Sequence, residues 1–279
     1  MTDARMDTSD AVADPEAGPV TAPTFAARGL WKHYGGVAAV RDVSIDFPAH
    51  TVTAIVGDNG AGKSTLIKML CGAIQPDQGE LMINGEEVRF PTPAAARHAG
   101  IATVYQDLAL ADHRNVAENL FLGRELVHSF GPVKFLRRAE MRRDAIAALA
   151  DLKIQVPDVR REARTLSGGQ RQGVAIARAV HQGATILVMD EPMAALGLQE
   201  QGRVISLVER LADRGLTQLI VSHNLDHVFR LSTRIAVMRL GQLVAIRETA
   251  ATDRSEILHL ISGIDPAAAA TARAEGESR

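Results

Sequence analysis

The sequence has 279 residues, and its 31 lysines and arginines nearly balance 33 aspartates and glutamates, giving a net charge of -2. That length suffices for one large domain or two small ones with a sizeable core. The near-neutral charge argues against a protein that mainly binds nucleic acid, because no overall positive field attracts a phosphate backbone. Cys71, the single cysteine, excludes an internal disulfide and a cysteine-based structural zinc site. No apolar stretch reaches the roughly 18 residues that predict a membrane-spanning helix.

The two ends of the chain differ in composition from the rest. Residues 1–22 are acidic and hold almost no large apolar side chains, so they predict a disordered tail that cannot offset its ordering entropy. Residues 264–279 are Ala-rich and polar and predict a second flexible tail. Residues 23–263 remain as one folded domain.

Short apolar runs alternate with helical periods across that domain, which predicts an α/β fold with a largely parallel sheet. Three runs predict buried strands at Thr51–Val56, Thr185–Met189 and Gln218–Val221, and each ends in the polar or glycine residues that line ligand sites in parallel sheets. Turns at Gly35-Gly36 and Asn84-Gly85 predict a small antiparallel β layer. Residues 107–165 hold helical periods and no convincing strand, which predicts a helical insertion.

The segment GDNGAGKS at residues 57–64 satisfies the pattern G-x-x-x-x-G-K-[ST] between a predicted strand and a predicted helix. Glycines let backbone amides approach phosphate oxygens, and the helix start adds its positive dipole. We expect Lys63 to reach the β- and γ-phosphates and Ser64 to offer its hydroxyl to Mg²⁺. The alternative is a plain glycine-rich turn. The residues assigned to nucleotide binding here are Gly57, Asp58, Asn59, Gly60, Ala61, Gly62, Lys63, Ser64 and Thr65.

A pair of acids follows the second predicted strand. Asp190 suits holding magnesium, and Glu191 suits orienting or deprotonating the attacking water. The alternative is a solvated acidic turn, and the presence of a complete phosphate loop argues against it.

The segment LSGGQ at residues 166–170, together with the two motifs above, resembles the signature of the ATP-binding subunits of ABC transporters. The resemblance covers about residues 23–263 and implies a P-loop ATPase core with a small antiparallel β layer and a helical insertion subdomain at 107–170. It also implies a head-to-tail homodimer in which ATP lies between the phosphate loop of one chain and the signature of the other. The signature residues carried over are Ser167, Gly168, Gly169 and Gln170.

Three further positions match the family residue by residue. Gln106 matches the glutamine that contacts magnesium and water, His223 the switch histidine that contacts the γ-phosphate, and Tyr34 the aromatic that stacks on adenine. The resemblance therefore implies a catalytic set of Glu191, His223, Gln106 and Lys63. Ordinary alternatives are a helix-cap glutamine, a strand-end histidine and a core tyrosine.

The chain departs from the family at Gly197, where the family usually has an aspartate that reaches across the dimer. This departure puts the usual coupling between the two ATP sites in doubt. A backbone contact from Gly197 could replace the missing carboxylate, because glycine allows close approach.

The stretches Phe90–Gln106, Val116–Glu125 and Asn224–Arg230 resemble the branch that imports monosaccharides such as ribose, xylose or fructose, in its single-domain form. The resemblance implies an ATPase with ATP and Mg²⁺, peripheral to the cytoplasmic face of the membrane. Its implied partners are permease subunits and, indirectly, a periplasmic or surface sugar-binding protein, with no nucleic acid.

The resemblance implies that residues 107–130 form part of the groove that receives a helix of the permease. Its candidate apolar contacts, or alternatively its core, are Leu108, Leu110, Leu120, Phe121 and Leu122.

Rival functions remain open from the sequence. They are an exporter ATPase, an importer of another small solute, a soluble ABC ATPase acting on ribosomes or DNA, and a nucleotide sensor without catalysis.

Overall fold

The computed structural model describes residues 23–130 and 133–263. The tails expected at 1–22 and 264–279 lie outside the described residues. Among the residues described, no helix is long and apolar enough to cross a membrane.

A six-stranded sheet forms the centre of the molecule, with the spatial order β12-β11-β3-β10-β9-β6. The pairs from β11 to β6 are parallel, and β12 joins β11 antiparallel. Every residue of β3 and of β10 is buried, as expected for strands covered on both faces. The three strands predicted from sequence are confirmed as β3, β9 and β10. The six strands are β3 (Val52–Val56), β6 (Ile101–Val104), β9 (Ile186–Asp190), β10 (Thr217–Val221), β11 (Arg234–Arg239) and β12 (Gln242–Glu248).

A second sheet is antiparallel, with the order β2-β1-β4-β5, and confirms the predicted antiparallel layer. The Asn84-Gly85 turn joins β4 to β5, and both residues have positive φ, 51° and 86°. Its strands are β1 (Pro23–Tyr34), β2 (Val37–Pro48), β4 (Gln78–Ile83) and β5 (Glu86–Val88).

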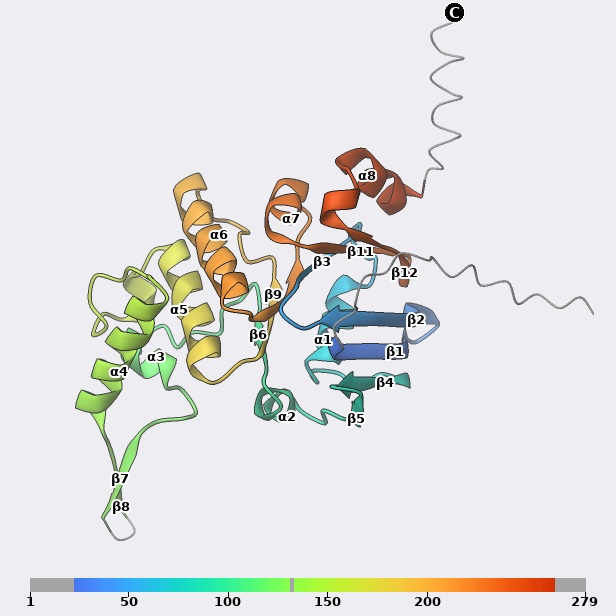
Figure 1. Cartoon of the computed structure of the whole chain (residues 1–279). Helices are drawn as coiled ribbons and strands as arrows, with labels where there is room; N and C mark the ends of the chain where they lie inside the picture. Colours follow the sequence, from blue (N-terminus) through green and yellow to red (C-terminus); the bar gives the residue numbers. More distant parts are fainter. Residues whose placement is uncertain (1–22, 131–132, 264–279) are drawn as a thin grey trace, which may run out of the picture.

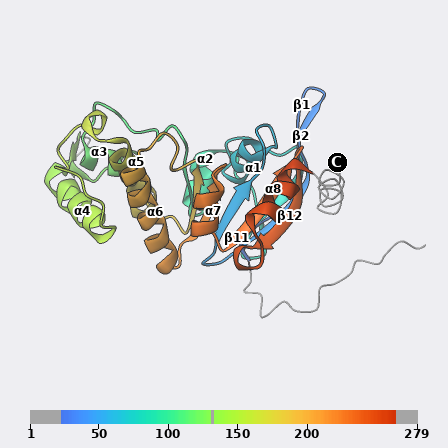
Figure 2. The same ribbon diagram turned by 90° about the horizontal axis from the view of Figure 1, so that it is seen from above.

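The helices divide into those that cover the sheets and those of the insertion. In both views, α3 and α4 lie at the end of the molecule opposite β1 and β2 (Figures 1 and 2). The helices are α1 (Lys63–Leu70), α2 (Pro93–His98), α3 (Val116–Leu120), α4 (Arg138–Asp151), α5 (Gly168–His181), α6 (Leu198–Asp213), α7 (Leu225–Leu231) and α8 (Arg254–Ser262), with short 3-10 turns at Ala163–Thr165 and Thr249–Ala251.

Helix α1 connects the two sheets through one hydrophobic cluster. Leu66 and Leu70 of α1 pack in the same cluster as Phe47 of β2 and Ile55 of β3, and all four side chains are fully buried. The apolar face of α1 is thus fixed from both sides, which sets the position of the loop that precedes it.

The expectation that the insertion contains no strand is wrong. The segments β7 (Val127–Phe130) and β8 (Val133–Leu136) pair as an antiparallel hairpin that projects from the rest of the insertion (Figure 1). Strands of four residues show too little alternation to be recognised from sequence, and the side chain of Phe135 is 60% exposed.

The five apolar residues considered for contact with a permease differ in how far they are buried. Leu120 and Phe121 are buried in the core of the insertion, so they cannot contact a partner. Leu108 and Leu110 are partly buried against that core, and Leu122 is 43% exposed.

Asn119 is a fully buried polar residue that holds the start of the insertion together. Its Oδ1 accepts from the backbone N–H of Ala111 at 2.8 Å. Its Nδ2 donates to the carbonyl oxygens of Ala111, Arg114 and Asn115 at 3.1 to 3.2 Å. The side chain thereby gives the backbone N–H of Ala111 its acceptor and adds a second donor to three carbonyl groups that already accept backbone N–H groups.

We expect Asn119→Ala to lower the free energy of unfolding by about 1–3 kcal/mol, because the backbone N–H of Ala111 loses its acceptor and the truncated side chain leaves a space in the buried core. Urea denaturation of both proteins would measure the loss. Asn84→Gly, at an exposed turn with φ of 51°, is the matched control and should change stability by less than about 1 kcal/mol. A loss no larger than that of the control would contradict this role of Asn119.

Candidate functional site

The loop of residues 57–62 joins β3 to α1 and approaches other backbone segments closely. Gly57 has φ of 148°, and a Cβ placed on it would lie 2.1 Å from the carbonyl oxygen of Met238. Gly62 has φ of 98°, and its Cβ would lie 2.5 Å from the carbonyl oxygen of Ala39. Glycine is therefore required at both positions on steric grounds alone.

Lys63 begins α1 and folds its side chain back over the loop. Its Nζ donates to the carbonyl oxygens of Gly57 at 2.7 Å and Asp58 at 2.8 Å. Burial lowers the pKa of Lys63, while the nearby carboxylates of Glu191, Asp58 and Asp190 raise it. The ammonium is thus held at the mouth of the loop, with carbonyl groups as its present partners.

Asp190 is the last residue of strand β9, and Glu191 follows it directly. Burial raises the pKa of Asp190, and the neighbouring Glu191 raises it further. Glu191 has φ of 51°, a conformation that non-glycine residues rarely adopt. Its N–H donates to the carbonyl oxygen of Val221 at 3.0 Å, which fixes this turn to the end of β10.

His223 follows β10 and contacts Glu191 in two ways. The backbone N–H of His223 donates to Oε1 of Glu191 at 3.0 Å, and its Nδ1 lies 2.8 Å from the same oxygen. The side chain of Glu191 is 19% exposed and that of His223 is 74% exposed. The carboxylate is therefore oriented from one side while the imidazole faces solvent.

One open cavity of about 520 Å³ brings these groups together. Tyr34, 51% exposed, lies on its rim, so the alternative of a core tyrosine is excluded. Gly57 and Asp58 line an adjoining cavity that also includes His223. The predicted site residues that line the main cavity are Tyr34, Asn59, Gly60, Ala61, Gly62, Lys63, Ser64, Thr65, Gln106, Asp190, Glu191 and His223.

The signature residues do not line this cavity within the single chain. Ser167 is the N-cap of α5, accepting from the N–H of Gln170 at 3.4 Å, while the Gln170 side chain accepts from the N–H of Ser167 at 3.0 Å. A Cβ on Gly169 would lie 2.8 Å from Cβ of Glu200 in α6, so the small residue allows α5 and α6 to pack closely.

Glu200 places a carboxylate beside the N-terminus of α5. The hydroxyl of Ser167 and the backbone N–H of Gly169 lower the pKa of Glu200. An anion is favoured at this helix end because of its free N–H groups and the helix dipole.

Sequence reasoning missed the residues that support the loop from outside the motifs. The N–H of Gly241 donates to the carbonyl oxygen of Ala61 at 3.1 Å. The N–H of Arg41 donates to the carbonyl oxygen of Gly241 at 2.7 Å. These contacts are made by backbone atoms of residues far apart in the chain, so no motif reports them. The sequence feature that could have indicated this turn is Gly241 itself, a glycine between two strands.

Arg178 is a second residue that sequence reasoning missed. Its guanidinium donates to the carbonyl oxygens of Ala109 at 2.8 Å and Leu108 at 2.9 Å. Burial lowers the pKa of Arg178. The signature helix is thereby joined to the segment that follows Gln106.

Cys71 has no part in the site. It is 2% exposed, and burial raises the pKa of its thiol to about 12, so the side chain packs as a small apolar group.

Known proteins resemble this chain in sequence and in structure. It is 44% identical to the fructose import ATP-binding protein FrcA of Rhizobium meliloti over 80% of this chain and 88% of that protein. It is 39% identical to the xylose/arabinose import ATP-binding protein XylG of Sulfolobus acidocaldarius, over 84% of this chain and 92% of that protein. The crystal structure of a nucleotide-free ATP-binding cassette from an ABC transporter superposes with a TM-score of 0.74 and 30% identity, covering 88% of this chain and 97% of that one.

Residues 40–194 match the family model described as ABC transporter, and this range spans the phosphate loop, the signature and the acidic pair after β9. With a relative 44% identical over most of both chains, the match agrees with the geometry of the cavity. The chain therefore belongs to the ABC transporter family, as an ATP-binding cassette.

Proposed function

We propose that the chain is the ATP-hydrolysing subunit of a monosaccharide importer, working through separate membrane permease subunits. The observation that carries the proposal is the single cavity in which Lys63, Asp190, Glu191 and His223 meet below the phosphate loop. The printed names of its relatives, import ATP-binding proteins for fructose and for xylose or arabinose, support a sugar as the cargo.

ATP would occupy the cavity with its phosphates on the loop of residues 57–62. Lys63 would exchange its bonds to the carbonyl oxygens of Gly57 and Asp58 for the β- and γ-phosphates. The exposed ring of Tyr34 on the rim offers a surface on which adenine can stack.

Mg²⁺ fits the oxygen donors on the floor of the cavity. Ser64, Gln106 and Asp190 all line it and offer a hydroxyl, an amide and one carboxylate, which are groups that bind Mg²⁺ in combination with phosphate oxygens and water. Within residues 23–130 and 133–263, no cluster of three or more acidic, histidine or cysteine side chains could hold a metal by itself. When bound, the ion would neutralise charge on the phosphate oxygens.

Glu191 is the residue placed to act on the attacking water. Its Oε1 accepts from the backbone N–H of His223 and lies 2.8 Å from Nδ1 of the same residue, and these two contacts orient the carboxyl group. His223, with its exposed imidazole, is free to contact the γ-phosphate. We assign Glu191 the role of general base and Lys63 the role of stabilising negative charge in the transition state.

The second half of each ATP site would come from another copy of the chain. Ser167 and Gly168 lie outside the cavity, at the N-terminus of α5, where an anion binds favourably. A head-to-tail homodimer would bring this helix end to the γ-phosphate held by the partner, after the carboxylate of Glu200 gives way. Gly197 offers no carboxylate across the dimer, so its part in such contacts is limited to its backbone.

Permease subunits would contact the insertion and receive the motion of the dimer. The exposed Leu122 lies in this region, and Arg178 ties the backbone of residues 108 and 109 to the signature helix. We therefore place the chain at the cytoplasmic face of the membrane, with a periplasmic or surface sugar-binding protein as an indirect partner.

Lys63→Ala should weaken ATP binding about 10- to 100-fold, because it removes a charge-assisted contact to phosphate oxygens. Isothermal titration calorimetry with ATP would measure the change. Lys134→Ala, which removes an exposed lysine from the β8 hairpin, is the matched control and should bind ATP like the parent protein. Equal affinities of the two variants would remove Lys63 from the phosphate site.

Glu191→Gln should retain ATP binding and lose at least about a hundredfold in turnover, because the amide cannot accept the proton of the attacking water. Phosphate release under saturating ATP and Mg²⁺ measures the rate, and gel filtration with ATP tests for a trapped dimer. Glu209→Gln, an exposed substitution in α6, serves as the control. Hydrolysis by Glu191→Gln at the parental rate would show that another group is the base.

Affinity capture from detergent-solubilised membranes of the source organism tests the transport function. We expect a polytopic permease and a sugar-binding protein to be recovered with this chain and identified by mass spectrometry. Leu122→Asp, which places a charge on an exposed apolar position of the insertion, should lose the permease and still bind ATP. Recovery of ribosomal proteins, or of no membrane protein, would exclude the transporter assignment and leave the soluble-ATPase alternative.

A further inference from the structure

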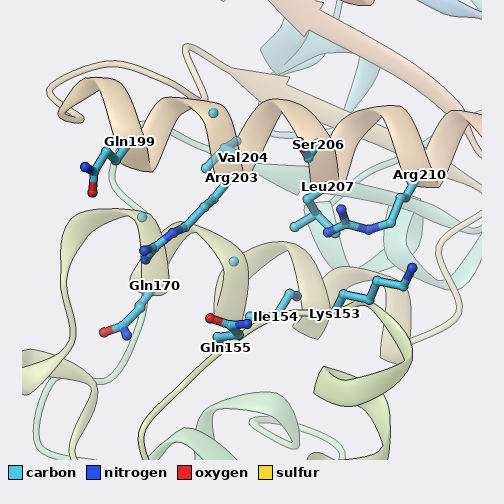
Figure 3. Close-up of a pocket in the computed structure, with 13 residues that line it drawn as sticks. Lys153, Ile154, Gln155, Gln170, Gln199, Arg203, Val204, Ser206, Leu207 and Arg210 are labelled. Atoms are coloured by element: carbon cyan, nitrogen blue, oxygen red, sulfur yellow. The ribbon is translucent and has the colours of Figure 1, made fainter.

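A groove separate from the nucleotide cavity runs between α6 on one side and α5 with residues 153–155 on the other (Figure 3). It encloses about 400 Å³, the size of a small metabolite, and shares no lining residue with the nucleotide cavity. Its lining residues are drawn in Figure 3. Among the residues that line the groove, only Gly169 and Gln170 of the signature have a role in the proposed function.

The charged side chains that line the groove are all cationic: Lys153, Arg203 and Arg210. In the described part of the chain, Lys153 and Arg203 form no ion pair within 4.0 Å, while Arg210 donates from Nη2 to the carbonyl oxygen of Leu152 at 3.0 Å. The Nε of Arg210 is buried and has no hydrogen-bond partner among the described residues. A buried donor without a partner is costly, so the guanidinium of Arg210 is not fully satisfied by the protein.

Carboxylates near the groove are already engaged elsewhere. Asp151 pairs with Arg214 at 2.6 Å, and Glu209 pairs with Arg230 at 2.9 Å. Glu200, one turn before Arg203, accepts from the signature helix. Asp151 and Glu209 are thus paired outside the groove, and the charge of Arg203 contributes to lowering the pKa of Glu200, so Lys153 and Arg210 are the groove cations without a nearby carboxylate among these three.

The uncharged residues that line the groove suit a ligand that carries hydroxyl groups. Figure 3 shows Arg203 pointing from α6 toward Gln170 and Gln155, while Lys153 and Arg210 lie toward the other end. Arg203 and Arg210 are seven positions apart on one helix, which separates their backbones by about 10 Å. Between the ends lie apolar carbons of Ile154 and Leu207, with amide and hydroxyl groups from Gln155 and Ser206.

We propose that this groove binds a phosphorylated sugar. Its phosphates lie at the cationic ends, on Arg203 and on Lys153 with Arg210. The C–H face of the sugar ring packs on Ile154 and Leu207, and its hydroxyl groups bond to the amides. A neutral sugar of the same size supplies no negative charge to the three cations and binds poorly.

Calorimetry on the full chain tests the proposal with the nucleotide cavity filled by saturating ADP and Mg²⁺, so that added phosphate groups cannot occupy the phosphate loop. The probes are fructose bisphosphate, unphosphorylated fructose and inorganic phosphate. We expect one fructose bisphosphate per chain, no heat from fructose, and weaker binding of inorganic phosphate.

The matched variants separate the groove from general surface charge. Arg203→Gln and Lys153→Gln, both at exposed positions that leave the core intact, should each weaken fructose bisphosphate binding about tenfold, because each removes a charge-assisted contact. Lys134→Gln removes an exposed cation from β8, which lines no part of the groove, and should not change the affinity. Absence of binding, or binding that Arg203→Gln and Lys153→Gln leave unchanged, would overturn the proposal. The readout is binding alone, so a failure here is distinct from a failure of ATP hydrolysis.

Discussion

The alignment of three parallel strands is the constraint on which the site depends. Val221 at the end of β10 is paired with Ile55 of β3 on one side and with Asp190 of β9 on the other. This register ends the strands at one edge of the sheet, so the phosphate loop, the acidic pair and the histidine emerge side by side, although more than 100 residues separate the loop from the other two. Shifting one strand by a residue would turn its side chains to the opposite face and separate these groups.

Backbone contacts from both sheets hold the phosphate loop in shape, in addition to the two hydrogen bonds from the Lys63 side chain. Gly57 and Gly62 contact carbonyl oxygens of β11 and of the antiparallel layer at distances that no Cβ would tolerate. The turn at Gly241 adds a hydrogen bond to Ala61. The loop is therefore preorganised by both sheets before any ligand arrives, which reduces the ordering that phosphate binding would otherwise require.

The motifs allowed much of this arrangement to be predicted from sequence. The strands at 51–56, 185–189 and 218–221 are present within a residue or two at each end, and twelve predicted site residues line one cavity. The β7–β8 hairpin was missed because four-residue strands carry little periodicity. Glu200, Arg178 and the turn at Gly241 were missed because each acts through contacts distant in the chain, often with backbone atoms, which leave no pattern in the sequence.

The two hydrogen bonds from Arg178 to residues 108 and 109 have a thermodynamic consequence. If these bonds make the segment after Gln106 and the signature helix move together, a displacement of either one also displaces the other. Binding free energies coupled in this way are reciprocal. Release of cargo by the permease would then change the affinity of the cassette for ATP. ATP binding would change the affinity of the permease for its cargo by the same factor. The cassette would act as a sensor of the transported molecule as well as a motor, without touching that molecule.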